Sequence, residues 1–243
     1  MPSLLIVGAN SDMAKAVAAR YAQAGFGLQL ASRDVVGLQK TAHDLQIRFD
    51  VPVEVFGFDI THLDSHRPFY EGLSEKPVGV VCAVGVMPDQ KIAQEEWVVL
   101  MNVLTINFTA CAAFLEVVAA DFEARKTGFI VGISSVAGDR GRQSNYIYGS
   151  AKAGFSAYLS GLRNRLAQVG VPVLTVKPGF VATKMTAGLR LPKWLTATPE
   201  AVAEAVFNAQ KQGRDVLYVK PIWRWIMAII TRIPERQFKG MKL

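Results

Sequence analysis

The stretch "LLIVGANSDMA", residues 4–14, joins a short apolar run to a polar helix start through one glycine. A β-strand that ends in a glycine turn and opens a helix is a building unit of doubly wound α/β sheets. Such a turn aims backbone N–H groups and the positive end of the helix at one point, which favours a bound phosphate. The stretch therefore predicts a nucleotide-binding turn at Gly8.

The same alternation continues along the chain. Apolar or β-branched runs recur in "GLQLAS", "PVEVFGF", "VGVVCAV", "GFIVGIS", "VPVLTVK" and "DVLYV", and most are separated by stretches with helical character. Strands that alternate with helices form a parallel sheet covered on both faces. For residues 1–219 we predict a single-domain Rossmann-type α/β fold, a doubly wound sheet of about seven parallel strands. Ligands of such sheets bind beyond the carboxyl ends of the strands.

Composition and charge narrow the class of protein. The 243 residues are enough for one α/β domain with a sizeable core. Cys82 and Cys111 lie in apolar runs without metal-ligand spacing, and "MPSLLIVGAN" shows no cleavable signal peptide, so we expect a reduced, cytoplasmic protein. Of the net charge of +7, +5 lies in residues 220–243. The remainder is nearly neutral, so nucleic acid is not an expected partner.

The end of the second predicted strand, "LASRD", bears on the cofactor. An acidic residue there would bind the ribose hydroxyls of NAD, whereas an arginine can pair with a 2′-phosphate. Ser32 and Arg33 therefore predict NADP(H), with an ordinary surface arginine as the alternative. Asp59 follows the third strand, where it either meets the adenine or stabilises a turn. Asp12, in the first turn of the helix after Gly8, is interpreted as favourable to the helix dipole, with a cofactor role as the alternative.

The stretch "YIYGSAK", residues 146–152, holds a tyrosine and a lysine that can act together. Residues four apart lie on the same face of a helix, so Tyr148 and Lys152 meet, while Tyr146 falls in the preceding turn. A nearby ammonium favours the ionised form of a phenol, which proton exchange near neutral pH requires. By itself, the pair is more typical of a core tyrosine beside a snorkelling lysine.

A longer spacing changes that interpretation. In "GFIVGISSVAGDRGRQSNYIYGSAK", Ser135 ends the fifth predicted strand and precedes Tyr148 by thirteen residues. With Ser135, Tyr148 and Lys152 in this order, residues 4–219 resemble the short-chain dehydrogenase/reductase family. Asn107, in "TINFTA", matches the fourth catalytic position of the family, and "KPGFVATKM" matches its segment after the sixth strand.

The resemblance implies a reaction and a role for each residue. Hydride would pass between the nicotinamide of NADP(H) and a substrate carbonyl carbon, with Tyr148 exchanging the proton at the carbonyl oxygen. Lys152 would support Tyr148 and hold the nicotinamide ribose. Ser135 would hydrogen-bond the substrate oxygen, and Asn107 would order a water through which Lys152 exchanges protons. The implied cofactor contacts are Gly8, Asn10, Ser11, Met13, Ser32, Arg33, Asp59, Gly85, Tyr148, Lys152, Pro178, Gly179, Val181 and Thr183.

The chain departs from the family pattern on the cofactor side. Asp12 and Ala14 stand at glycine positions, and "CAVG", residues 82–85, stands where the family has Asn-Asn-Ala-Gly. The catalytic positions all match. The implied chemistry needs no metal, and His62 and His66 with their acidic neighbours are interpreted as a polar turn rather than a metal site.

Residues 220–243 form a basic amphipathic extension. If residues 222–233 are helical, one face carries five isoleucines: Ile222, Ile226, Ile229, Ile230 and Ile233. The apolar run is too short to span a bilayer, but its tryptophans and flanking arginines suit the interface of an anionic membrane, through Ile222 to Lys242. The alternative is that this face packs on the domain or on a second subunit.

Residues 183–199 resemble the substrate-covering loop of the family. The loop contains Met185, Leu189, Leu191, Trp194 and Leu195, which predict either a substrate with an apolar portion or an apolar lid that closes onto the core. The tail and "ISSVAGDRGRQSNY" are also similar to a bacterial branch that includes the decaprenylphosphoryl keto-ribose reductase. The resulting prediction is an NADP(H)-dependent carbonyl reductase of an apolar or lipid-linked substrate, cytoplasmic or peripheral at the inner membrane face. The resemblance implies a homodimer or homotetramer.

Two other functions stay open. One is a soluble ketoacyl or hydroxysteroid-type reductase whose tail is buried between subunits. The other is a membrane-bound NADP-binding protein with little turnover. Near the site, Tyr146 with Arg140 or Arg142 either reaches the substrate or belongs to a solvated loop.

Overall fold

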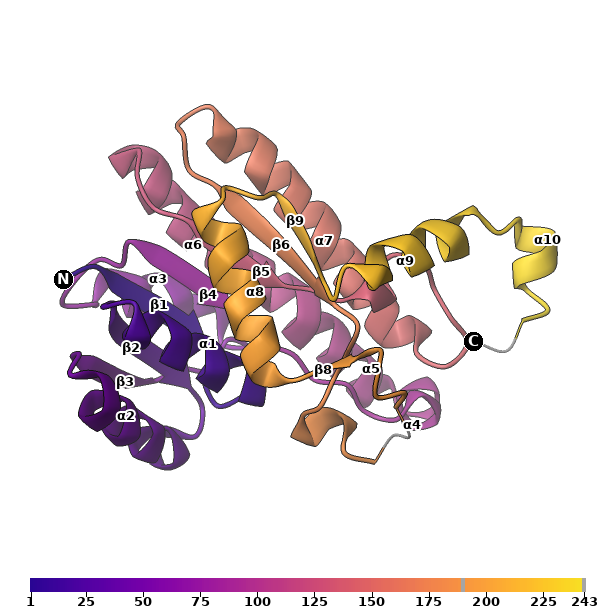
Figure 1. Cartoon of the computed structure of the whole chain (residues 1–243), viewed down its shortest axis with the longest axis horizontal. Coiled ribbons are helices and arrows are strands. Elements are labelled where there is room, and N and C mark those ends of the chain that lie inside the picture. Colours follow the sequence, from indigo (N-terminus) through magenta and orange to yellow (C-terminus); the bar gives the residue numbers. More distant parts are fainter. Residues whose placement is uncertain (189–190, 242–243) are drawn as a thin grey trace.

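The computed structural model describes residues 1–188 and 191–241 and contains a seven-stranded parallel sheet (Figure 1). The strand order is β3-β2-β1-β4-β5-β6-β9, which confirms the predicted doubly wound fold. The strands are β1 (Ser3–Val7), β2 (Gly27–Ser32), β3 (Val53–Gly57), β4 (Gly79–Cys82), β5 (Ile130–Ile133), β6 (Val173–Pro178) and β9 (Val216–Val219). A second, two-stranded sheet pairs β7 (Phe180–Val181) with β8 (Thr196–Ala197). Leu189 of the predicted loop and Lys242 of the predicted tail lie outside the described residues.

Helices cover both faces of the large sheet (Figure 1). One face carries α1 (Asp12–Gln23), α2 (Val35–Phe49) and α8 (Pro199–Lys211). The other carries α3 (His66–Glu71), α6 (Ala110–Arg125) and α7 (Tyr146–Ala167). Two further helices, α4 (Gln90–Glu95) and α5 (Trp97–Leu104), pack against α7. Short 3₁₀ turns occur at Leu63–Ser65 (η1), Val136–Gly138 (η3) and Lys184–Thr186 (η4).

Each central strand supplies residues to two hydrophobic cores. Leu4 and Ile6 of β1 join the core under α1 and α8, while Leu5 and Val7 join the core under α6 and α7. Side chains alternate between the two faces of a strand, and here both faces are covered. This explains why the strands read as continuous apolar runs in the sequence.

The continuous helix from Trp97 to Arg125 contains an 18-residue stretch with a mean hydropathy of 2.0 and is long enough to cross a membrane. Its second half packs Phe114, Val118 and Phe122, all fully buried, against the sheet and α7. The core therefore accounts for the apolar character of this half, whereas Trp97, Val98 and Met101 in the first half are exposed. A π-helical turn, Thr105–Thr109 (η2), separates α5 from α6.

The chain ends in α9 (Ile222–Arg232) and α10 (Glu235–Phe238), which extend from one end of the molecule in Figure 1. Trp223 and Met227 are buried against Val136. The exposed side of α9 carries Ile222 with Trp225 and Ile229, which are 69% and 68% exposed. The predicted isoleucine face is present on the helix, but the surface that packs on the domain is centred on Trp223 and Met227, so Ile226 and Ile230 border the core while Ile222 and Ile229 stay exposed.

Candidate active site

Tyr148 and Lys152 lie on the first turns of α7, as predicted, whereas Tyr146, which was expected in the preceding turn, is the first residue of the helix. Lys152 is buried, and its Nζ donates to the backbone carbonyls of Ile133, at 3.1 Å, and Val84, at 3.4 Å. The same Nζ lies 5.9 Å from the centroid of the Tyr148 ring. Two carbonyls from the ends of β4 and β5 thus hold the ammonium beside a half-buried phenol. Burying a charge is tolerated where polar groups of this kind surround it.

Ser135 lies just beyond the carboxyl end of β5. Its Oγ caps the 3₁₀ turn η3 by accepting from the N–H of Ala137 at 3.1 Å. The neighbouring Ser134 was not singled out from the sequence, yet its Oγ donates to the carbonyl of Lys152 at 3.0 Å and lies 2.7 Å from the Oγ of Ser156. Ser134 therefore fastens β5 to α7, which sets the position of Ser135 relative to the tyrosine. The sequence signal that could have identified Ser134 is a second serine at the end of β5.

Asn107 is fully buried in the π-helical turn η2. Its Nδ2 donates to the carbonyls of Val103, at 2.9 Å, and Val86, at 2.8 Å, and its Oδ1 accepts from the N–H of Val86 at 3.2 Å. The side chain thus holds the loop after β4. A Cβ added to Gly85 would lie 2.9 Å from the Asn107 Oδ1 and 3.4 Å from the Lys152 Nζ, so glycine lets these groups approach each other.

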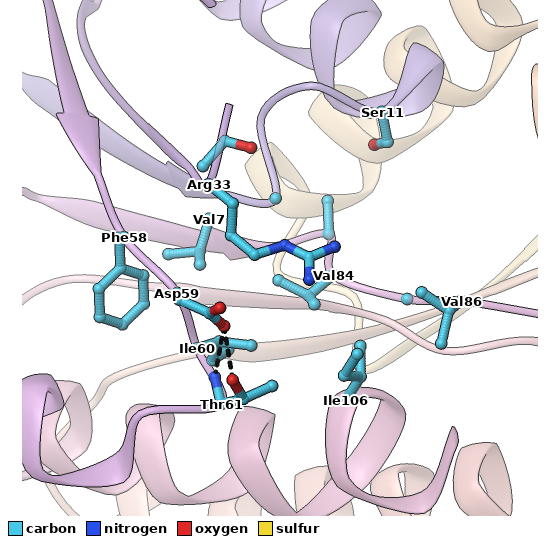
Figure 2. A pocket seen from close by; sticks show the side chains of 14 residues that line it. Val7, Ser11, Arg33, Phe58, Asp59, Ile60, Thr61, Val84, Val86 and Ile106 are labelled. Atoms are coloured by element: carbon cyan, nitrogen blue, oxygen red, sulfur yellow. Dashed lines mark hydrogen bonds between the residues drawn. The ribbon is translucent and has the colours of Figure 1, made fainter. Parts of the chain in front are cut away.

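A cavity of about 150 Å³ opens beyond the ends of β1, β2 and β4. Six of the predicted cofactor residues line it: Gly8, Ser11, Ser32, Arg33, Asp59 and Gly85. Figure 2 shows the guanidinium of Arg33 reaching across this cavity toward Val84. The other predicted contacts do not line this cavity; they are Asn10, Met13, Tyr148, Lys152, Pro178, Gly179, Val181 and Thr183.

The floor of the cavity depends on a glycine at the first turn. Gly8 has φ of +80°, and a Cβ there would lie 2.9 Å from the backbone of Ala83. Both the dihedral and the close approach require glycine. Asn10 stabilises the turn, because its Nδ2 donates to the Oγ of Ser32 at 3.1 Å and to the carbonyl of Asp34 at 2.7 Å.

Asp59 also lines the cavity. Its Oδ1 accepts from the N–H and the hydroxyl of Thr61, at 2.9 and 2.7 Å (Figure 2). Burial alone would raise the pKa of Asp59, but these bonds and the positive charges of Arg33 and His62 outweigh it, so the pKa lies below its ordinary value. The sequence left two roles open for Asp59, an adenine contact and a turn contact. The structure shows the turn contact.

Asp12 has a long-range partner that the sequence did not indicate. It lies in the first turn of α1, and its Oδ2 accepts from the backbone N–H of Lys184 at 2.8 Å. Lys184 opens η4, at the start of the loop formed by residues 183–199. The carboxylate therefore connects the cofactor turn to this loop.

The basic and aromatic residues around the start of α7 have separate roles. Arg140 points away from the site to the tail: its Nη1 donates to the carbonyls of Ile230, Thr231 and Ile233, at 2.6–3.2 Å. Tyr146 is partly exposed, and its hydroxyl accepts from the Nε2 of Gln94 at 2.8 Å. Arg140 is thus an anchor for α9 rather than a substrate contact.

His66 is part of the core. Its Nε2 lies 2.7 Å from the carbonyl oxygen of Ile60, and its ring packs on Phe58 and Phe114. Burial lowers its pKa, and the hydrogen bond to Ile60 opposes that shift. Among residues 1–188 and 191–241 there is no group of three His, Cys, Asp or Glu side chains that could hold a metal ion.

The family model for short chain dehydrogenases matches residues 3–194. The chain belongs to this family. An uncharacterized oxidoreductase of Mycobacterium tuberculosis is 33% identical over 241 residues, covering 98% of this chain and 96% of that protein. The very-long-chain 3-oxoacyl-CoA reductase-A of Danio rerio is 29% identical, covering 94% and 74%.

A solved structure gives the same result for the fold. A short-chain dehydrogenase from Sphingobium yanoikuyae in complex with NADPH superimposes with a TM-score of 0.83 at 25% identity, covering 97% of each chain. The family predicted from Ser135, Tyr148 and Lys152 is therefore confirmed, as is an oxidoreductase.

Proposed function

We propose that the protein is an NADP(H)-dependent carbonyl reductase, or the reverse secondary-alcohol dehydrogenase. The observation that carries the proposal is the buried Lys152 ammonium beside Tyr148, next to Ser135 at the strand end. Bound NADPH would supply the hydride for the carbonyl carbon. The remaining chemistry belongs to the side chains.

Tyr148 is proposed to donate the proton to the carbonyl oxygen during reduction and to accept it during oxidation. The Lys152 ammonium stabilises the phenolate that proton donation leaves behind. The Ser135 hydroxyl donates a hydrogen bond to the same oxygen and stabilises the charge that develops there. Asn107 keeps the loop after β4 against Lys152, and we propose that it orders the water through which Lys152 exchanges its proton.

The cavity residues fit a 2′-phosphorylated dinucleotide. Gly8 leaves no Cβ between the first turn and Ala83, and the Arg33 guanidinium faces the cavity beside the Ser32 hydroxyl. A guanidinium is the group best suited to a terminal phosphate. NADPH in the Sphingobium relative supports the same choice. The proposed contacts of the nicotinamide half are Tyr148, Lys152, Pro178, Gly179, Val181 and Thr183.

The proposed substrate has an apolar or lipid-linked portion. In the loop formed by residues 183–199, Trp194 is 64% exposed and Met185 is also exposed, so the loop offers apolar surface. The reductase from Danio rerio, whose name specifies a very-long-chain 3-oxoacyl-CoA, supports an amphiphilic carbonyl compound. Residues 1–219 would form the catalytic domain and residues 220–243 an extension.

The exposed stripe of α9 supports a site at the inner face of an anionic membrane. Trp225 and Ile229 are exposed beside Arg224 and Arg232, which gives apolar insertion flanked by positive charge. Lys220 links this surface to the loop by donating from Nζ to the Trp194 carbonyl at 2.8 Å. The buried half of α9 favours the second candidate, a soluble ketoacyl or hydroxysteroid-type reductase whose exposed stripe meets another subunit.

A homodimer or homotetramer is proposed for either case. The outer face of α7 exposes the small residues Ala157, Ser160 and Gly161, which permit close approach of a second copy. The protein is proposed to be cytoplasmic, with membrane contact peripheral.

NADPH oxidation tests the reaction, with ketones, ketoacyl thioesters and lipid-linked keto-sugars as substrates. Tyr148→Phe should reduce kcat about 10²- to 10⁴-fold, the usual contribution of general acid catalysis, while the NADPH dissociation constant stays within about twofold. Turnover that is undiminished in this variant would refute the assignment.

Co-sedimentation of Trp225→Ser with anionic vesicles tests the exposed surface of α9 without disturbing its buried half. Binding by the parent and its loss in the variant would support the membrane, and a parent that stays in the supernatant at low salt would favour the second candidate.

A further inference from the structure

Unpartnered polar atoms gather beside the first turn of α7. Among the described residues, four buried side-chain atoms lack a hydrogen-bond partner, and three of them are the Gln90 Nε2, the Arg142 Nε and the Asn145 Oδ1. The fourth, the Oε1 of Gln29, belongs to β2 on the far side of the sheet order. Buried polar groups are normally paired, so a cluster of exceptions at one place indicates a missing partner.

Two hydrogen bonds and the order of the chain bring the three residues to the same end of α7. The Oε1 of Gln90 accepts from the N–H of Ile147 at 3.3 Å, which places the amide one residue before Tyr148. Asn145 precedes α7, and its side chain forms no capping bond. Its backbone N–H donates to the carbonyl of Arg142 at 3.1 Å. Asn145 is three residues before Tyr148, or about 5 Å along the helix axis.

In the loop before α7, every charged side chain except that of Arg142 has a partner among the described residues. Arg140 is bonded to the tail and to Glu235, at 2.7 Å. The Asp139 carboxylate is bonded to Lys177 and accepts from the Tyr218 hydroxyl at 2.9 Å. Within the described residues, the side chain of Arg142 has neither an ion pair nor a hydrogen bond.

Burial acts on this remaining cation. It lowers the pKa of the Arg142 guanidinium, and the nearby Asp139 carboxylate opposes that shift only in part. An arginine stays protonated in proteins, so a half-buried guanidinium with a free Nε is a donor that needs an acceptor. The ligand that best satisfies it is an anionic oxygen group, bound through the planar edge of the guanidinium.

We propose that Arg142, with the amide of Gln90, binds a phosphate or carboxylate of the substrate while the substrate carbonyl lies at Tyr148. The inference rests on the proposed carbonyl reductase and narrows its substrates to carbonyl compounds with an anionic group a few bonds away. A phosphate in an amphiphile's head group and a phosphate on a free metabolite share this chemistry. The site is distinct from the exposed basic residues of α9, which face the solvent.

Matched ketones test the inference. They share one carbon skeleton and differ in their terminal group: a phosphate ester, a carboxylate and a neutral alcohol. NADPH-dependent kcat and KM are measured for each with the parent, Arg142→Gln, Arg142→Lys and the control Arg67→Gln, whose guanidinium is exposed on α3. A lipid-linked keto-phosphate in vesicles, compared with the free ester, distinguishes the two sources.

The parent should have a lower KM for the anionic ketones than for the neutral one. Arg142→Gln should raise the anionic KM about 10- to 100-fold, the effect of losing one hydrogen bond between charged groups. The neutral KM, the kcat and the NADPH dissociation constant should change less than about twofold. Arg142→Lys should recover part of the loss, and Arg67→Gln should match the parent. Inorganic phosphate should compete with the anionic ketone and raise the Tm of the parent but not of Arg142→Gln.

Two results would overturn the inference and leave the reductase intact. One is an equal KM for neutral and anionic ketones in the parent. The other is an equal rise for both in Arg142→Gln, which is expected if Arg142 serves polar packing. Absence of Tyr148-dependent turnover with every ketone would instead reject the reductase, and the inference with it.

Discussion

Removal of the Arg140 side chain should release the end of α9. One guanidinium nitrogen donates to three carbonyls at the carboxyl end of this helix, and the other pairs with Glu235. The guanidinium carbon also lies 3.8 Å from the centroid of the Phe238 ring. Arg140→Ala deletes all of these contacts and leaves Trp223 in place.

The size of the effect can be worked out from these contacts. A partly buried cation at a helix carboxyl end contributes up to about 2 kcal/mol, and a cation–π contact about 0.5–1 kcal/mol. The Glu235 side chain is 79% exposed, so its ion pair adds about 0–1 kcal/mol. Because the contributions overlap, we expect about 2–3 kcal/mol for the local opening of α9. That corresponds to an opening constant larger by about 30- to 150-fold.

Hydrogen–deuterium exchange of the amides of residues 226–233 measures this opening. Their exchange in Arg140→Ala should accelerate by at least about tenfold, while the amides of β4 and β5 keep their protection. Glu235→Gln is the matched control, and it should accelerate exchange by less than about fivefold. Unchanged protection of residues 226–233 in Arg140→Ala would refute the conclusion that this arginine holds the tail.

Three further perturbations test the site. Gly85→Ala should lower kcat, because a Cβ would lie 2.9 Å from the Asn107 Oδ1; a Michaelis–Menten analysis in which kcat equals that of the parent would contradict the close approach. Asp12→Ala should raise the KM of the carbonyl substrate several-fold by freeing the Lys184 N–H, whereas Asp12→Asn, which keeps an acceptor, should not; an equal KM in both variants would argue against the contact. Asp59 has a lowered pKa, so its contribution to stability is present above its ordinary pKa of about 3.9 and is lost as the pH falls through the folded value; Asp59→Asn should therefore flatten the acid limb of stability in urea titrations below about pH 4, and an unchanged limb would exclude the contribution.

Local pattern was sufficient to predict the sheet and the proximity of Tyr148 to Lys152. The strands are apolar on both faces, which is visible in the sequence, and Tyr148 and Lys152 are joined by helix spacing alone. The positions of Gly8 and Arg33 at the cavity were likewise predictable, since each residue directly follows a strand that is recognisable in the sequence. In these cases, the residues that decide the geometry are close together in the chain.

The remaining contacts depend on tertiary packing. Asp12 and Lys184 are 172 residues apart, and no short pattern indicates that they meet. The side of α9 that is buried depends on the shape of the surface around Val136, whereas the sequence shows only an apolar arc. Arg140 could be assigned to the substrate or to solvent from the sequence, but not to a helix end 90 residues later.

The π-helical turn at Thr105–Thr109 also has a consequence for the comparison of relatives. Such a turn holds one residue more than the α-helical register, and it rotates the next helical segment by about 100°. Deleting one residue there would restore an ordinary helix and turn Asn107 away from the loop after β4. Homologues whose alignment shows a one-residue gap within this segment would therefore have an ordinary helix there. Their asparagine, even where it is retained, would no longer be in position.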